Sequence, residues 1–141
     1  MANQIMIVDD ETNILSAMSR ALDSLPSTDI EIFEKPADAL KRARTTIFDV
    51  FLVDYQMPGM NGVELLSQIK MLQPDSVRMI VSGKSDKSSL IEAINHAEIY
   101  RFIEKPWNNR NLIHEIEKAL IYRKALQEKR ILFDQMRQLL M

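Results

Sequence analysis

Acidic residues end two separate apolar runs of this sequence, and a lysine closely follows a third run. Asp9 and Asp10 come directly after the first run, Asp54 ends the second, and Lys105 lies two positions beyond the third. Carboxylates that converge repel one another unless one is protonated or a cation lies among them. Hard oxygen ligands with no sulfur nearby favour Mg²⁺ as that cation. The three signals together predict one phosphate-handling site.

The predicted chemistry at such a site is phosphoryl transfer. An aspartate carboxylate can attack a phosphorus centre and form an acyl phosphate when the charge on the phosphoryl oxygens is neutralised. A bound Mg²⁺ supplies most of that neutralisation, an ammonium group adds a second positive charge, and a hydroxyl adds a hydrogen bond. Lys105 and Ser82 offer the last two groups. Because this transfer depends mainly on positioning and electrostatics, few residues are needed.

Five short apolar or alternating runs have the length and composition of strands. They lie at residues 4–8, 30–33, 48–53, 77–81 and 99–103. Apolar residues at helical spacing fill the segments between these runs and after the last. Thr12 and Asn13 can cap the first helix, Pro36 suits the first turn of the second, and turn residues precede the third.

Strands that alternate with helices in this way predict an α/β fold with a doubly wound parallel sheet covered on both faces. The flavodoxin-like strand order 2-1-3-4-5 is one known arrangement of this kind. In such sheets ligands bind outside the carboxyl ends of the strands, where residues far apart in sequence converge. The fifth run is partly polar, which is typical of an edge strand.

The composition excludes several classes of function. A chain of 141 residues fits one domain. Its 18 basic and 20 acidic residues give a net charge of -2, so we expect neither nucleic-acid nor membrane binding. The absence of cysteine excludes a disulfide framework, a thiolate zinc site and a cysteine nucleophile. Because no signal peptide or membrane-spanning run is recognisable, the sequence predicts a cytoplasmic protein.

Residues 4 to 120 resemble the receiver domain of two-component response regulators. The resemblance rests on five features in order, each at the end of a strand: Asp9-Asp10, Asp54, Met57-Pro58-Gly59-Met60-Asn61-Gly62, Ser82 and Lys105-Pro106. It implies the flavodoxin-like sheet in order 2-1-3-4-5, with Mg²⁺ as cofactor. It also implies a histidine kinase or phosphotransfer protein as partner, whose phosphohistidine donates the phosphoryl group. Self-phosphorylation and autodephosphorylation are the only reactions implied, so no turnover enzyme is expected.

The resemblance assigns the metal ligands residue by residue. Asp54 is implied to be the phosphoacceptor and a Mg²⁺ ligand, and Asp10 a direct ligand. Asp9 is implied to reach the metal through water, and Gln56 to add its backbone carbonyl.

The resemblance also implies a switch. Ser82 and Lys105 assist the transfer, and Ser82 with its loop moves toward the phosphoryl group. Phe102 then turns into the space behind that loop, so that two packings become alternatives. Many relatives carry tyrosine at this position, whose hydroxyl is missing here. The expected output face is the fourth helix, fifth strand and fifth helix, and Gln56 and Lys84 occupy positions that tune hydrolysis of the acyl phosphate.

Ordinary structural roles compete with these assignments. Asp9 and Asp10 can simply cap the helix that follows, Asp54 can be a turn residue, and Lys105 can be an exposed lysine. Pro106 favours a functional lysine, because a proline restricts the preceding residue to an extended geometry.

The last helical pattern runs to Met141 without glycine or proline, beyond position 121 where a receiver domain ends. Apolar residues recur there every seven positions, at Ala119, Leu126, Phe133 and Leu140, with Tyr122 and Met136 in the intervening phase and Lys129 breaking it. A lone helix cannot bury this stripe. We therefore expect a receiver domain at 1–121 and a helical extension at 122–141, either a coiled-coil linker or a dimerisation segment to an absent output domain.

Several alternatives concern this extension and what it serves. A homodimer is expected through the last helix, the output face, or both. The basic residues Arg123, Lys124, Lys129, Arg130 and Arg137 are interpreted as a solvated face. Residues 100–107 resemble receivers that precede HD-GYP-type phosphodiesterases or ATPase transcriptional activators.

Three other functions compete with this one. A phosphorylation-independent interaction module with the same fold usually lacks an acid or the lysine, and neither is missing here. A standalone single-domain regulator requires the tail to fold back on its own domain. An aspartate-nucleophile phosphatase of the haloacid-dehalogenase type requires Asp-x-Asp, whereas here the acids are adjacent at Asp9 and Asp10 and the residue two beyond Asp9 is Glu11.

Overall fold

Five parallel strands form one sheet in the order β2-β1-β3-β4-β5 in the computed structural model, which describes residues 2–86, 90–91 and 95–141. The strands are β1 (Asn3–Val8), β2 (Thr28–Phe33), β3 (Val50–Asp54), β4 (Val77–Ser82) and β5 (Arg101–Glu104). The predicted flavodoxin-like order 2-1-3-4-5 is therefore confirmed. β5 forms an edge of the sheet, as its polar residues indicated.

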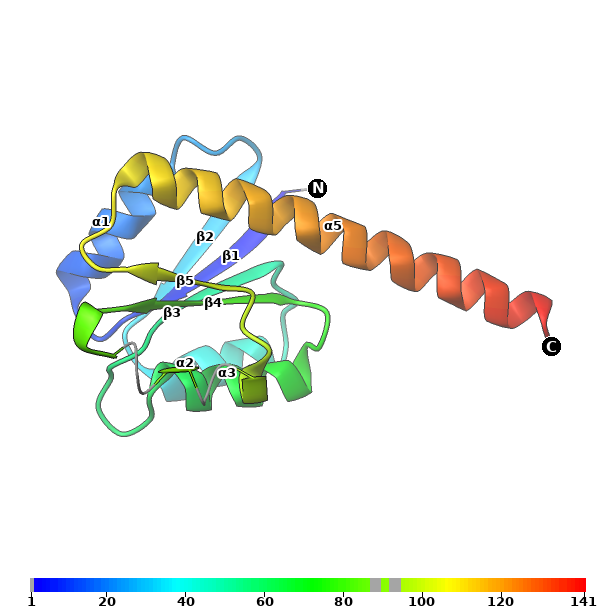
Figure 1. The fold of residues 1–141 in the computed structure, drawn as a ribbon, viewed down its shortest axis with the longest axis horizontal. Coiled ribbons are helices and arrows are strands. Elements are labelled where there is room, and N and C mark those ends of the chain that lie inside the picture. The colour runs from blue at the N-terminus through cyan, green and yellow to red at the C-terminus, as the bar shows by residue number, and fades with distance from the viewer. Residues whose placement is uncertain (1, 87–89, 92–94) are drawn as a thin grey trace.

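Helices cover both faces of this sheet (Figure 1). They are α1 (Thr12–Leu22), α2 (Pro36–Ala43), α3 (Gly62–Leu72) and α5 (Asn109–Leu139), together with the 3₁₀ turn η1 (Lys84–Asp86). Figure 1 shows α1 and α5 on one side of the sheet and α2 and α3 on the other. Between β4 and β5, where a helix was predicted, residues 90–91 and 95–97 are helical. Ala93 and Ile94 of that prediction lie outside the described residues.

The predicted place of Pro36 in the first turn of α2 is confirmed, and the structure adds the residue that caps α3. Pro36 is the first residue of α2. Asn61 caps α3, since its side chain accepts from the Glu64 backbone at 2.9 Å while the Glu64 side chain accepts from the Asn61 backbone at 3.3 Å. This capping box ends the turn that follows Asp54 and fixes where α3 begins.

The prediction that Thr12 and Asn13 cap α1 was wrong. Thr12 is already the first helical residue, and Glu11 occupies the cap position without a side-chain hydrogen bond. The Asp9 carboxylate instead accepts from the Glu11 backbone N–H at 2.9 Å. An upstream acid thus shapes the turn into α1.

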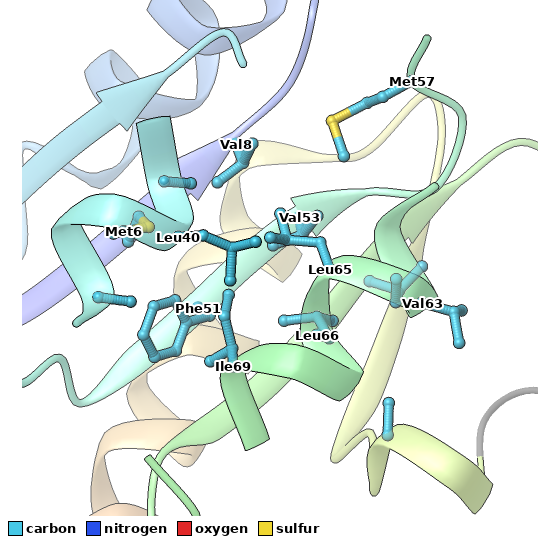
Figure 2. Close-up of a cluster of buried hydrophobic side chains, with 14 of the residues drawn as sticks. Met6, Val8, Leu40, Phe51, Val53, Met57, Val63, Leu65, Leu66 and Ile69 are labelled. Carbon is cyan, nitrogen blue, oxygen red and sulfur yellow. The ribbon is translucent and has the colours of Figure 1, made fainter. Parts of the chain in front are cut away.

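The central strands are buried on both faces. In β1, Met6 and Val8 belong to the core beneath α2 and α3, whereas Ile5 and Ile7 belong to the core beneath α1 and α5. Figure 2 shows the first of these clusters, in which Phe51 and side chains of α2 and α3 interlock. Strands covered on both sides read as continuous apolar runs, which is why the strands before the acids were easy to recognise.

At the end of the sheet opposite the acids, buried polar side chains fix the loops in place. The Gln73 amide donates to the carbonyls of Ala43 and Thr46 at 2.8 and 2.7 Å and accepts from the Phe48 N–H at 2.9 Å. The buried Arg78 guanidinium donates to the Ala97 carbonyl at 2.9 Å. These bonds satisfy backbone groups that the loops would otherwise leave unpaired.

α5 is a single helix of 31 residues that projects beyond the sheet (Figure 1). Residues 127–141 are exposed, so the tail does not fold back on the receiver as the standalone reading required. The predicted boundary at 121 falls inside this helix. Within the described part of the chain, none of the helices combines the length and apolar character needed to cross a bilayer.

The predicted solvated basic face was wrong at Arg123. Its side chain is buried, donates to the Asp49 carboxylate at 3.2 Å and donates to the Asp75 carbonyl at 2.8 Å. Seven residues, or about two helical turns, further on, Arg130 pairs with the Asp75 carboxylate at 2.6 Å in a more exposed setting. The loops before β3 and β4 therefore hold α5 past the predicted domain boundary, because two arginines seven residues apart pair with Asp49 and Asp75 in those loops.

Candidate phosphoacceptor site

Three carboxylates converge at the carboxyl ends of β1 and β3. Asp54 is the last residue of β3, and Asp9 and Asp10 follow β1, its neighbour in the sheet. One oxygen from each of the three lies within 4.8 Å of the others. Asp9 and Asp54 are buried and Asp10 is exposed. The predicted acidic cluster is therefore present in the fold, with one member open to solvent.

Lys105 reaches this cluster from the edge of the sheet. Its Nζ lies 2.8 Å from Asp54 Oδ1 and 3.3 Å from Asp9 Oδ2. The Lys105 backbone N–H donates to the Ser82 carbonyl at 2.8 Å, which extends the pairing of β5 with β4. The peptide bond from Lys105 to Pro106 is cis. The structure thus brings together the acids and the lysine that the sequence singled out.

Burial controls the electrostatics of the site. Desolvation raises the pKa of Asp54 to about 6; the negative charges of Asp9 and Asp10 also raise it, and Lys105 lowers it. Desolvation likewise raises the pKa of Asp9, against the opposing effects of the Glu11 N–H and Lys105. For Lys105, burial lowers the pKa, but bonding to Asp54 and the charges of both acids outweigh it and the net shift is upward.

The donor set fits a divalent hard cation. Three carboxylate oxygens face one another, and a single ammonium group cannot balance all three charges. Oxygen-only ligands with one solvent-exposed member suit Mg²⁺, which keeps several waters when it binds. Asp9, Asp10 and Asp54 are the residues that would hold the ion. Gln56, predicted to add its backbone carbonyl, lies two residues after Asp54 in the same loop.

Ser82 stands on the strand next to Asp54. It is the last residue of β4 and is buried, and the adjoining Val81 pairs with Asp54 in the sheet register. The Val81 carbonyl also accepts from the Tyr55 N–H at 2.9 Å. The predicted hydroxyl is therefore held at the same edge of the sheet as the phosphoacceptor candidate.

Sequence reasoning missed Asp86, which links two loops at the site. It accepts from the Gln56 amide at 2.8 Å and from the Gly83 N–H at 3.0 Å. The only signal was its place in a polar segment after β4. Lys84, predicted to tune hydrolysis, lies in η1, but its side chain is outside the described part of the structure.

Gly62 explains part of the turn sequence after Asp54. A Cβ atom at Gly62 would collide with the backbone carbonyl oxygen of Asp54, so the start of α3 can pass this close only as glycine. Gly59 in the same turn has a φ of 84°, a conformation that other residues rarely adopt. The glycines thus hold the Asp54 loop against the helix that follows.

Phe102, the predicted switch residue, lies on the edge strand. Its side chain is 41 % exposed, whereas the next residue, Ile103, is buried. A cavity of about 750 Å³ lies beside it between β5 and α5, away from the carboxylates. A smaller hollow of about 460 Å³ adjoins the site itself and is lined by Ile14, Lys105, Pro106, Trp107 and Asn109.

Known proteins are similar to this chain in sequence. Residues 5–117 match the family described as the response regulator receiver domain. The hydrogenase transcriptional regulatory protein HoxA of Bradyrhizobium diazoefficiens is 36% identical over 122 residues, which cover 84% of this chain and 24% of that protein. The DNA-binding transcriptional regulator NtrC of Escherichia coli is 29% identical over 126 residues, covering 89% of this chain and 26% of that one.

Solved structures agree on the fold. A CheY-like response regulator receiver domain protein from Methanospirillum hungatei superposes with a TM-score of 0.80 at 28% identity, covering 89% of this chain and 98% of that one. The chain spans about a quarter of the length of HoxA and NtrC. Because the family match takes in β1 to α5 with the acidic cluster, Ser82 and Lys105, this chain belongs to the response regulator receiver domain family.

Proposed function

We propose that this chain is the phosphoacceptor domain of a two-component response regulator and that Asp54 receives the phosphoryl group. The observation that carries the proposal is the contact of 2.8 Å between Lys105 Nζ and Asp54 Oδ1 inside the cluster with Asp9 and Asp10. A buried carboxylate with a raised pKa, held beside an ammonium group, is typical of a reactive site. The donor is the phosphohistidine of a histidine kinase or phosphotransfer protein.

In the transfer, an Asp54 carboxylate oxygen attacks the phosphorus of the donor. The new O–P bond forms as the P–N bond to the imidazole breaks, and the nitrogen keeps the electron pair and takes a proton from solvent. Lys105 faces the developing charge on the phosphoryl oxygens, and the Ser82 hydroxyl donates a hydrogen bond to them. Mg²⁺ held by Asp9, Asp10 and Asp54 would neutralise further charge on those oxygens.

The donor has an apolar surface to rest on beside the acceptor. The hollow next to Lys105 is lined by Ile14, Pro106 and Trp107, so a partner that reaches Asp54 covers apolar side chains on the way. Buried apolar area of this kind stabilises a complex between two proteins. This chain therefore supplies both the reacting carboxylate and a contact area for the protein that carries the phosphohistidine.

The proposed switch runs from Ser82 to the edge of the sheet. Ser82 pairs in register with Glu104 on β5, so movement of Ser82 toward a phosphoryl group pulls on the strand that carries Phe102. The face made by β5, α5 and the helical segment before β5 changes with it. Acyl phosphate formation and its hydrolysis are the only reactions proposed, and a cytoplasmic location is part of the proposal.

A homodimer is the proposed assembly. The exposed apolar side chains Phe133, Met136 and Leu140 continue along α5 beyond the receiver, where a second copy can cover them. HoxA and NtrC are transcriptional regulators about three and a half times as long as this chain, which favours a transcriptional output domain over a phosphodiesterase.

The test loads the chain with acetyl phosphate and Mg²⁺ and measures intact mass. Wild type is expected to gain one phosphoryl group and Asp54→Ala none, whereas the exposed α2 acid variant Asp38→Ala gains it normally. Beryllofluoride, which mimics the acyl phosphate, is then added with Mg²⁺ while light scattering follows mass and shape. A phosphoryl group that remains on Asp54→Ala, or none on wild type, would overturn the proposal.

A further inference from the structure

One buried carboxylate joins the two loops that flank Asp54. Asp86 Oδ1 accepts from the side-chain amide of Gln56 at 2.8 Å, and Asp86 Oδ2 accepts from the backbone N–H of Gly83 at 3.0 Å. Asp86 is 7 % exposed, so its end of each bond is sheltered from water, whereas Gln56 is exposed. Hydrogen bonds to a charged acceptor are stronger than neutral ones, and a bond to each oxygen fixes the carboxylate between its two partners.

The bond determines which way the Gln56 amide faces. An ionised carboxylate can only accept, so the amide nitrogen of Gln56 must point to Asp86 and the amide oxygen must point elsewhere. Gln56 is otherwise an exposed residue, and such a side chain samples several rotamers unless it is tied. Asp86 therefore gives the Gln56 amide oxygen one orientation in the loop that begins at Asp54.

We propose that Asp86 is a positioning residue for hydrolysis of the acyl phosphate and acts through the Gln56 amide; this rests on the proposed phosphorylation of Asp54. In that step a water oxygen attacks the phosphorus, the O–P bond to Asp54 breaks, and the Asp54 carboxylate leaves with the electron pair. Inorganic phosphate forms, and the water protons pass to it and to solvent. The Gln56 amide oxygen orients the attacking water by accepting one of its hydrogen bonds.

The second bond ties this orientation to the switch. Gly83 follows Ser82 directly, so a shift of Ser82 toward the phosphoryl group carries Gly83 and Asp86 with it. The Gln56 amide must then follow Asp86. Asp86 thus lets the state of the Ser82 loop set the lifetime of the phosphoryl group.

A double-mutant cycle tests this role on the full chain. Wild type, Asp86→Ala, Gln56→Ala and the double variant are loaded with acetyl phosphate and Mg²⁺, the donor is removed, and release of inorganic phosphate is timed. Ser85→Ala is the matched control, because Ser85 is exposed in the same turn. Loading rates and urea midpoints are measured in parallel to separate hydrolysis from folding.

Asp86→Ala is expected to slow phosphate release about fivefold to twentyfold while loading stays within about twofold of wild type. In the Gln56→Ala background the same change is expected to alter release less than about twofold, and Ser85→Ala should behave as wild type. If all variants take the phosphoryl group but Asp86→Ala has no effect, speeds release, or acts equally in both backgrounds, the role of Asp86 is wrong. If wild type takes no phosphoryl group, the proposed function itself fails.

Discussion

Lys105 Nζ lies between two buried carboxylates, 2.8 Å from Asp54 Oδ1 and 3.3 Å from Asp9 Oδ2. The edge strand of the sheet thereby supplies the positive charge for acids on its central strands. This ion pair exists before any phosphoryl group arrives. The same contact therefore contributes to the stability of the domain and to its reactivity.

Replacing Lys105 with methionine should destabilise the fold. Two buried carboxylates lose their counter-charge, which costs about 1–3 kcal/mol of unfolding free energy at pH 7.5 without Mg²⁺. The cost should shrink at pH 5, where the acids can take up protons. Urea unfolding at both pH values measures it, with Lys118→Met as the control because Lys118 lies on the surface of α5. Equal losses for the two variants would contradict the assigned role of Lys105.

Asp54→Asn should make the domain more stable at neutral pH. Burial raises the pKa of Asp54 to about 6, so the folded state binds a proton more tightly than the unfolded chain does. Ionisation of Asp54 therefore lowers the stability of wild type as pH rises from about 4 to above 6, by up to roughly 3 kcal/mol. The variant should exceed wild type by about 1–3 kcal/mol at pH 7.5 in EDTA.

The advantage of Asp54→Asn should decline as pH falls below 6 and nearly vanish near pH 4. Urea titrations across this range give the comparison directly. The prediction fails if the variant is less stable than wild type at pH 7.5, or if the difference in unfolding free energy does not depend on pH. Either result would show that burial does not destabilise the ionised Asp54 carboxylate.

Mg²⁺ should raise the thermal midpoint of wild type. An ion at ten times its dissociation constant adds about 1.4 kcal/mol to the folded state. Asp10→Asn should weaken this stabilisation, since Asp10 is one of the three acids that converge. Asp134→Asn on the exposed part of α5 is the matched control and should respond like wild type. A midpoint that shifts equally in both variants would place the ion elsewhere.

Arg123→Met should cost more stability than Arg130→Met, although both arginines lie on one helix and pair with acids in the loops before β3 and β4. Arg123 is buried and pairs with the partly buried Asp49, and its loss leaves that carboxylate with the Gln4 N–H but without its counter-charge, at a cost of about 2–4 kcal/mol. The Arg130 pair with Asp75 is exposed and should contribute less than about 1 kcal/mol. Urea unfolding compares them, and a larger loss for Arg130→Met would reverse the assignment.

Phe133→Glu should prevent self-association. Phe133 is exposed on the apolar stripe of α5, and a charge there opposes burial against a second helix. Light scattering over a range of concentrations should show a dimer for wild type and a monomer for the variant. Gln127→Glu adds the same charge at an exposed position off the stripe and should remain dimeric. If both variants dimerise, the interface lies on another face.

The residues were sufficient for the five strands and for the convergence of the acids with Lys105, whereas the strand order came from the resemblance to receiver domains. Strands buried on both faces can be recognised in the sequence as apolar runs. The carboxyl ends of parallel strands lie together at one end of the sheet. Sequence alone did not separate Asp9 from Asp10, which are adjacent yet differ in burial. The side each residue takes depends on the turn after β1, where Asp9 bonds to the Glu11 N–H.

The contacts that escaped sequence reasoning join side chains across loops. Asp86 with Gln56, and Arg123 with Asp49, are 30 and 74 positions apart. No repeat in the sequence relates such pairs. Each residue alone is of a type that usually faces solvent in a loop or on a helix. Arg123 is an interior residue only because α5 packs against the loops before β3 and β4. Tertiary contacts therefore reassign polar residues that local patterns place in solvent.

α5 also fixes a direction in space. Its 31 residues span about 46 Å in one straight helix, and the partly buried bond of Arg123 to Asp49 sets the angular phase at which that helix leaves the domain. Each residue inserted after Arg130 would rotate the far end by about 100°, whereas seven would return it to within about 20° of its original facing. The number of residues in α5 thus sets the orientation, about the helix axis, of any domain joined to its end.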